Sequence, residues 1–374
     1  MEDERMNKPI VKPDKMGSYR EEDVIFLLRD ISDYKIERKS EDREKLIQSG
    51  THYSEMLPVE YQPTDEYLSL FHKTLDQYAQ RVAIAVGVVA EQIIDRNGLE
   101  DLVLVSLARA GTPIGILIKR YLSFKYQVEV PHYSISIIRG RGIDETAIDY
   151  IFDQHAQAKI QFVDGWTGKG AITYELDEAC KAYNETHDNQ LDSNLSVLAD
   201  PGHCVSTYGT RDDFLIPSAC LNSTVSGLVS RTVLNYDFME KGDFHGAKYY
   251  RELQDADVSN LYVDTITKEF EKVQDDVAEN LRELKEEDTF PSWKGMKSVE
   301  LIQERFEINN THFIKPGLGE TTRVLLRRVP WKILVNPKYS NDLTHILMLA
   351  QERNVPIEEF TDMSYSCCGL IKEL

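Results

Sequence analysis

Residues 102–113 read LVLVSLARAGTP, and residues 160–170 read IQFVDGWTGKG. Each stretch is a short apolar run that leads into a glycine-containing loop, and each loop precedes a segment with helical periodicity. Apolar strands that alternate with helices are typical of an α/β domain with a mainly parallel sheet. Both loops would then lie beyond the carboxyl ends of their strands, where open parallel sheets hold their ligands.

The same alternation extends on both sides of the two loops. Short apolar runs predict strands, and helical periodicity between them predicts helices. The predicted strands cover residues 102–105, 133–138, 160–163 and 195–199. The predicted helices cover residues 67–96, 114–122, 145–157 and 171–187.

The last third of the chain predicts a different organisation. We expect a long acidic helix over 261–287, a linker over 288–300, strands over 324–326 and 333–335, and a helix over 343–354. The expected division of the chain is an N-terminal helical extension over 1–99, an α/β domain over 100–290 and a small C-terminal α/β module over 305–374.

Composition limits the class of protein. The 374 residues include 43 basic and 63 acidic side chains, which give a formal net charge of −20. Such a chain repels nucleic-acid phosphates at long range, so phosphate would be bound by local backbone amides, single Lys or Arg side chains or a metal. No apolar stretch reaches membrane length and the first residues lack a secretory signal, so we expect a cytoplasmic protein that does not bind membranes.

The chain has five cysteines, Cys180, Cys204, Cys220, Cys367 and Cys368. An odd number without a secretory signal argues against a disulfide framework. Their spacing also lacks the Cys and His pairs of structural zinc sites. A cysteine hydrolase stays open as an alternative function: Cys204 follows His203, and Cys220 and Cys368 are the other candidate nucleophiles. Buried inert thiols are the simpler interpretation.

The loop over residues 164–170, which follows the predicted strand over 160–163, has the chemistry of an anion site. Its three glycines let successive backbone N–H groups converge on an anion, and the next helix adds partial positive charge. Thr167 would donate a hydroxyl, and Asp164 would hold a ribose hydroxyl or Mg²⁺. The alternative is a strand-to-helix turn that Asp164 caps and that binds no ligand.

The loop after the first strand offers an amide pocket at Gly111 and Thr112, and Pro113 suits the first helical turn. Arg109 would neutralise the charge of a pyrophosphate. Between the loops, residues 139–142 (RGRG) suit a mobile lid that carries positive charge over the ligand. The alternatives are an ordinary turn with an exposed arginine and a solvated basic hairpin.

The order of loop, basic segment and second loop over residues 100–235 resembles the type I phosphoribosyltransferases, which bind phosphoribosyl pyrophosphate (PRPP) with Mg²⁺. The resemblance implies the sheet of that family, phosphoribosyl transfer to a base or related acceptor, and a homodimer. Asp164 would bind the metal, and the catalytic residues would be Asp164, Arg109, Arg139 and Arg141. The ligand-binding residues would be Ala110, Gly111, Thr112, Gly165, Trp166, Thr167, Gly168, Lys169 and Gly170.

Four longer segments are similar to one branch of that family, which is encoded beside tellurium-resistance genes. They are Asp212–Asn222, Val225–Arg231, Asp243–Ala247 and Lys315–Arg323. This resemblance implies synthesis of a nucleoside-like metabolite in a stress pathway, and a Pelota-like, RNA-binding C-terminal module. Some members of the branch are labelled cysteine proteases.

A non-catalytic nucleotide or RNA sensor is a further alternative. Tyr365 would stack on a base. Positive charge for RNA would come from Arg323, Arg327, Arg328, Lys332 and Lys338. A solvated basic edge on a small module is the simpler interpretation of the same residues.

Overall fold

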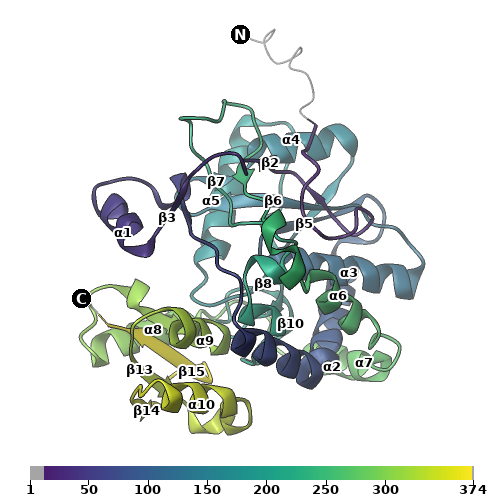
Figure 1. Ribbon diagram of the computed structural model, residues 1–374. Helices are drawn as coiled ribbons and strands as arrows, with labels where there is room; N and C mark the ends of the chain where they lie inside the picture. The colour runs from purple at the N-terminus through teal and green to yellow at the C-terminus, as the bar shows by residue number, and fades with distance from the viewer. Residues whose placement is uncertain (1–11, 373–374) are drawn as a thin grey trace.

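The computed structural model describes residues 12–372 of the chain (Figure 1). The predicted N-terminal extension and C-terminal module therefore begin and end outside the described residues, and their boundaries stay predictions. The description leaves out the side chains of Ser40, Glu41, Glu44, Gln48, Arg327, Ser340 and Asn341.

A parallel sheet forms the centre of the molecule. Its strands lie in the order β1, β6, β5, β8, β9 and β10, and each neighbouring pair on this path is parallel. Strand β7 (Gly142–Ile143) adds an antiparallel hairpin to β6. This confirms the predicted α/β class with a mainly parallel sheet. The bounds are β1 Ile25–Phe26, β5 Leu102–Ala108, β6 His132–Ile138, β8 Lys159–Trp166, β9 Leu195–Ala199 and β10 Thr207–Thr210.

The alternating side chains of β5 contribute to two separate cores. Leu102 and Leu104 belong to one core, and Val103 and Val105 belong to the other, because successive side chains leave opposite faces of a strand. The first core is closed by α2, α3, α6 and α7, and the second by α4 and α5. The bounds are α2 Asp65–Asn97, α3 Gly111–Tyr126, α4 Glu145–Gln154, α5 Ala171–Thr186, α6 Ser259–Thr267 and α7 Gln274–Leu284.

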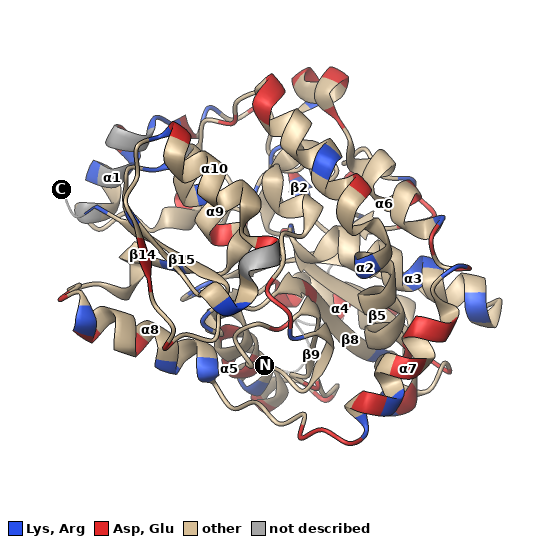
Figure 2. Cartoon of the chain, turned by 90° about the horizontal axis from the view of Figure 1, so that it is seen from below, with Lys and Arg blue, Asp and Glu red and all other residues tan. Residues whose placement is uncertain are grey.

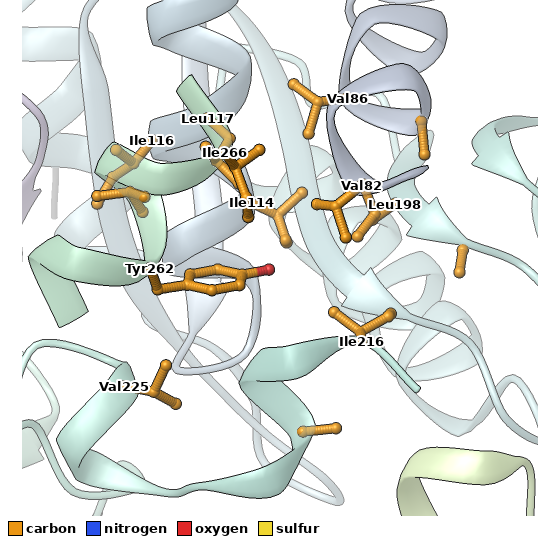
Figure 3. Packing of buried hydrophobic residues seen from close by; sticks show 14 of the residues in the cluster. Val82, Val86, Ile114, Ile116, Leu117, Leu198, Ile216, Val225, Tyr262 and Ile266 are labelled. Atoms are coloured by element: carbon orange, nitrogen blue, oxygen red, sulfur yellow. The ribbon is translucent and has the colours of Figure 1, made fainter. Parts of the chain in front are cut away.

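The larger core joins segments that are far apart in the sequence (Figure 3). Val82 and Val86 of α2 lie near Ile114 of α3, and Tyr262 and Ile266 of α6 complete the group. Each fully buried aliphatic side chain of this kind contributes about 1.5–3 kcal/mol to folding. The core therefore fixes α3, and with it the loop between β5 and α3.

Short elements precede α2 and lie on the outside of the central sheet. β2 pairs in parallel with β11, and β3 pairs in parallel with β4. The bounds are β2 Arg29–Asp30, β3 Glu37–Arg38, α1 Ser40–Gln48, β4 Leu57–Pro58 and β11 Gly246–Ala247.

A small mixed sheet with helices on both faces forms the C-terminal module (light green to yellow in Figure 1). Its strands lie in the order β12, β15, β13 and β14; the pairs that include β15 are antiparallel, and β13 pairs with β14 in parallel. The bounds are α8 Lys294–Arg305, β12 Ile314–Pro316, α9 Leu318–Arg327, β13 Pro330–Val335, α10 Thr344–Glu352, β14 Ile357–Glu359 and β15 Cys367–Ile371.

Three predictions for the last third of the chain are wrong. Residues 324–326 lie inside helix α9, whose apolar residues Leu318 and Leu325 are buried, and do not form a strand. The long acidic helix is two helices, α6 and α7, because turns over 268–273 bring Phe270 into the core between them. The expected linker already contains the start of α8 at Lys294.

The acidic charge of the chain is visible on α7, where red segments mark Asp and Glu (Figure 2). Asp275 and Asp276 stand in its first turn, and Val277 packs against α2 at Gly87. Between residues 12 and 372 we find no helix that is long and apolar enough to cross a membrane. The cytoplasmic location stays a prediction.

Candidate functional site

The two glycine-containing loops lie against each other at the carboxyl edge of the central sheet. They follow the neighbouring parallel strands β5 and β8, in which Ser106 pairs with Val163. A Cβ atom on Gly111 would overlap with the Val163 carbonyl oxygen, and one on Gly165 would lie 3.2 Å from the Ala110 carbonyl oxygen. Glycine at both positions therefore allows the loops to approach this closely.

A cleft runs along these loops, between the sheet and the C-terminal module. It consists of a cavity of about 270 Å³ and a second cavity of about 240 Å³, which share Asp164, Trp166 and Ile172. The module contributes Arg323 to the first cavity, and Lys315 and Glu320 to the second. We call the first the base-side cavity and the second the lysine cavity.

The cleft collects most of the residues that the sequence singles out. Arg109, Ala110, Asp164 and Trp166 line the base-side cavity. The residues that line the lysine cavity include Arg139, Asp164, Trp166, Thr167, Gly168, Lys169 and Gly170. Their catalytic or binding roles stay predictions.

Four of the predicted site residues are not among the residues that line these two cavities. Gly111 and Gly165 support the loops from behind, as described above. The Thr112 hydroxyl lies 2.7 Å from the Ser134 hydroxyl inside the protein. Arg141 forms an ion pair with Glu55 and donates to the Leu234 carbonyl oxygen at 2.9 Å. Arg141 is therefore used to hold an outer loop.

The RGRG segment is a tight hairpin between β6 and β7. The Glu175 carboxylate of α5 accepts hydrogen bonds from the Gly140 and Gly142 amides, at 2.8 and 3.0 Å. Of the two arginines in this segment, Arg139 lines the lysine cavity, whereas Arg141 lines neither of the two cavities. The predicted mobility of this segment as a lid stays a prediction.

Asp164 lines both cavities, and its carboxylate has an unusually high pKa. Burial raises its pKa to about 7, although the Gly165 amide donates a hydrogen bond to it at 2.8 Å. Among residues 12–372, no group of three or more His, Cys, Asp or Glu side chains is arranged to hold a metal ion. Asp164 is the predicted metal ligand in this cleft; we assign no step to Mg²⁺, and the predicted Mg²⁺ cofactor stays a prediction.

The module supplies site residues that the sequence analysis did not assign to the cleft. The Arg323 guanidinium lies 5.1 Å from the centre of the Trp166 ring and forms an ion pair of 2.9 Å with Glu320. Lys315 and Glu320 also line the lysine cavity. Segment 315–323 is one of the four segments similar to the tellurium-resistance branch. Its position opposite the glycine loops depends on long-range packing, which local sequence patterns do not predict.

The module contacts the Gly168–Gly170 loop directly. The Tyr365 hydroxyl donates to the Gly168 carbonyl oxygen at 2.9 Å, and the Gly295 amide donates to the Gly202 carbonyl oxygen at the same distance. The buried Asp213 carboxylate accepts hydrogen bonds from the Leu318 and Ser366 amides, at 2.9 and 2.8 Å. Tyr365 is fully buried, so the prediction that it stacks on a base is wrong.

All five cysteines are buried, and no disulfide joins any two of them. Cys204 is the cysteine at the back of the glycine loop: its sulfur lies 3.8 Å from the Gly168 carbonyl oxygen. Burial and, to a smaller extent, the charge of the nearby Asp200 raise the pKa of Cys204 to about 12. The Asp200 carboxylate accepts hydrogen bonds from the Thr167 hydroxyl and from the Cys204 amide, the latter at 2.8 Å.

His203 belongs to the same turn as Cys204. It has a positive φ of 50°, and its carbonyl oxygen accepts a hydrogen bond from the Trp293 amide of the module at 3.0 Å. Burial lowers the pKa of His203 to about 4, and Arg211 and Lys294 contribute. In the described part of the chain its buried Nδ1 atom has no hydrogen-bond partner. The imidazole is therefore neutral at pH 7, and in this docked arrangement it is a weaker base than a free histidine.

Comparison with known proteins divides the chain into two matched regions. Residues 17–267 match the family described as "Tellurite-like stress resistance cysteine protease StiP", and residues 293–373 match the family described as "PELOTA RNA binding domain". The protein named "Cysteine protease StiP" of Acinetobacter baylyi (strain ATCC 33305 / BD413 / ADP1) is 34% identical over 381 residues, with 98% of this chain and 96% of the relative covered.

These matches correct the function that the loops predicted. Both the first family and the relative are named as cysteine proteases, so the prediction of a phosphoribosyltransferase that acts on PRPP is wrong. Glycine loops at the ends of parallel strands form a cleft in proteins of many activities, and the loops alone do not determine the reaction. The resemblance to the tellurium-resistance branch and to a Pelota module is confirmed, whereas a type I phosphoribosyltransferase fold is not shown. The extent and identity of the matches show that this chain belongs to the StiP family.

Proposed function

We propose that this chain is a cysteine hydrolase that cleaves peptide bonds in a tellurite-like stress response, with Cys204 as its nucleophile. The observation that carries the proposal is the position of Cys204 behind the Gly168 loop, in one turn with His203 and Asp200. A thiol, a neutral imidazole and a carboxylate are the groups that nucleophilic cysteine catalysis uses.

The other cysteines support the choice of Cys204. Cys367 and Cys368 lie outside the region that matches the protease family. Cys180 is on α5 and packs in the core with Leu176, whereas the Cys204 sulfur lies beside the Gly168 carbonyl oxygen of the glycine loop. The Cys220 sulfur lies 3.7 Å from the Thr74 hydroxyl of α2, on the core side of its 3₁₀ turn.

In the proposed reaction His203 removes the proton from the Cys204 thiol as the sulfur attacks the carbonyl carbon of the scissile peptide bond. The tetrahedral intermediate collapses to a thioester, and the leaving amine takes the proton from the imidazole. Water then hydrolyses the thioester, with the imidazole again as the base, and the thiol is restored. Asp200 acts as a positioning residue, because it holds the amide of Cys204 and the hydroxyl of Thr167.

The docked module sets a condition on this reaction. Cys204 is only 1% exposed, and a Cβ atom on Gly170 would meet both the Trp293 ring and the Cys204 sulfur. With the module docked the thiol is protonated and covered, so we propose that hydrolysis requires the module to move away from the Gly168–Gly170 loop. Water that enters the turn would then lower the pKa of the thiol.

The test is hydrolysis of unfolded protein and of fluorogenic peptides by the purified full-length chain. We expect Cys204→Ala and His203→Ala to abolish hydrolysis, and we expect iodoacetamide to inactivate the wild type with the label on Cys204. The control is Cys180→Ala, another buried cysteine, which should keep its activity. Full activity of a folded Cys204→Ala variant would refute the assignment.

RNA binding by the C-terminal module is a second function that we propose, and the match of residues 293–373 to an RNA-binding family favours it. Among the predicted basic residues, Arg328 and Lys338 are exposed, whereas Lys332 forms an ion pair with Glu358 and Arg323 forms one with Glu320. Among these predicted residues, Arg328 and Lys338 are therefore the exposed cations without an ion pair in the described part of the chain.

A further inference from the structure

We propose that the cleft between the central sheet and the module is the seat of one RNA nucleotide, with its phosphate in the lysine cavity and its base in the base-side cavity. This inference rests on the proposed RNA binding and adds that most of the residues lining the binding site come from the protease-family region. Single-stranded RNA is the form that fits, because cavities of this size admit a splayed-out nucleotide and exclude a duplex.

The first support is the convergence of cations from two parts of the chain. Lys169 and Arg139 come from the central domain, and Lys315 comes from β12 of the module. Burial lowers the pKa of Lys169 to about 8, and Lys315 and Arg139 contribute to this shift. Burial also lowers the pKa of Lys315, to which Arg139 again contributes. These groups are therefore close enough to repel one another.

The positive charges of this group also act on His312 of the module. Burial lowers its pKa, and the charges of Arg139, Lys169 and Lys315 lower it further. His312 therefore reports the positive charge of these three side chains. A set of like charges that destabilise one another is relieved by a bound phosphate, which is the electrostatic requirement for an anion site.

The second support is the excess of cations over carboxylates at the lysine cavity. Within residues 12–372 we find no ion pair of Lys169, Lys315 or Arg139, and the Lys169 ammonium donates to the Thr311 carbonyl oxygen. Two carboxylates line the lysine cavity. Asp164 has a pKa of about 7 and is therefore only partly ionised at pH 7. Burial of Glu320 favours its neutral form, but the charges of Arg323 and Lys315 outweigh burial and lower the pKa of Glu320. Positive charge is therefore in excess here, in a chain whose net charge is −20.

The third support is an aromatic surface beside the cations. Trp166 lines both cavities, and the Arg323 guanidinium lies over its ring. Bases of single-stranded nucleic acids stack on indole rings and on guanidinium planes. Ser218 and Asn222 from the facing 3₁₀ turns also line the base-side cavity and offer hydrogen bonds to the edge of a base. A small acidic ligand would explain the lysines but not the aromatic wall.

The experiment is fluorescence anisotropy of a labelled single-stranded oligouridine of about eight nucleotides with the full-length chain. We expect Lys169→Ala, Arg139→Ala and Lys315→Ala each to weaken binding about five- to tenfold, because each removes a phosphate contact. Lys297→Ala, at an exposed lysine of α8 that lines neither cavity, should stay within about twofold. Lys169→Arg should keep most of the affinity, because it keeps the positive charge. It therefore separates the loss of charge in Lys169→Ala from a folding defect. The logarithm of the association constant should fall with the logarithm of salt with a slope of about −2.

The outcomes separate the seat from RNA binding itself. If RNA binds but only Arg328→Ala and Lys338→Ala weaken it, the seat in the cleft is refuted and RNA binding by the module stands. If the wild type binds no RNA, both proposals fail. If the cleft variants lose affinity for a polyglutamate peptide but not for oligouridine, the cleft is an acidic-peptide site and the inference is overturned.

Discussion

At the scale of the residue, burial changes the protonation of the groups that face the cleft. Asp164 and Lys169 are both removed from water, and in each case burial favours the neutral form. The sequence contains both residues, but it does not contain the depth at which each is buried. Their charge near pH 7 therefore could not be predicted from the sequence alone.

Asp164→Asn should stabilise the fold in a pH-dependent way. The folded pKa of Asp164 is raised to about 7, so its effect on stability is most favourable at low pH and is lost as pH rises toward 7. The amide variant avoids this loss, and we expect a gain of about 1–3 kcal/mol at pH 8 that shrinks toward pH 5. Urea unfolding of both chains across this pH range is the measurement, and a gain that is independent of pH would contradict the assignment.

RNA affinity should depend on pH through Lys169. Its pKa is lowered to about 8, so the ammonium loses its proton as pH rises from 7 to 9, and binding should weaken over that range. Lys315, whose pKa is also lowered, contributes in the same direction, whereas Arg139 keeps its charge. Lys169→Arg should flatten most of the profile. Anisotropy titrations at constant salt test this, and an unchanged profile in Lys169→Arg would exclude Lys169 as the titrating group.

At the scale of the element, the sequence predicts the central domain better than the module. Strand β9 has the bounds that its apolar run predicts, because a fully buried parallel strand reads as a continuous apolar run. The same type of run in residues 324–326 belongs to helix α9, because three apolar residues fit one face of a helix as well as a strand.

Leu325→Ala tests the assignment of α9. Leu325 is fully buried on the face of α9 that packs into the large core, so we expect a loss of about 2–4 kcal/mol in the free energy of unfolding. Leu347→Ala on α10 is the matched control, because that side chain is 40% exposed, and its effect should stay below about 1 kcal/mol. Chemical denaturation followed by circular dichroism measures both. Equal losses would argue against the burial of this face of α9.

At the scale of the whole molecule, the site is shared between regions that the sequence does not connect. The two glycine loops were predicted to meet because they follow strands of one sheet, and they do. The cations that face them could not be predicted, because Lys315 and Arg323 reach the cleft only through the docking of the module. Local pattern thus predicts one wall of the cleft, and long-range packing supplies the other.

Tyr365→Phe should loosen this docking. The change removes the hydrogen bond to the Gly168 carbonyl oxygen and leaves that oxygen without its donor, at a cost of about 1–3 kcal/mol. Cys204 should then react faster with iodoacetamide, by about five- to tenfold, as judged by mass spectrometry of the labelled peptide. Tyr61→Phe, at a side chain that is 71% exposed, is the control and should leave the rate unchanged. Labelling of Tyr365→Phe at the wild-type rate would show that the docked module does not protect the thiol.

The loop over 168–170 has Lys169 on the cleft side and the Cys204 sulfur on the other side. Peptide hydrolysis is proposed for the chain with its module moved away from this loop, and the RNA seat is proposed for the docked module. Two ligands that favour different positions of the module are linked thermodynamically: the factor by which RNA lowers the affinity for a peptide equals the factor by which the peptide lowers the affinity for RNA. Docking of the module would thus let each partner displace the other.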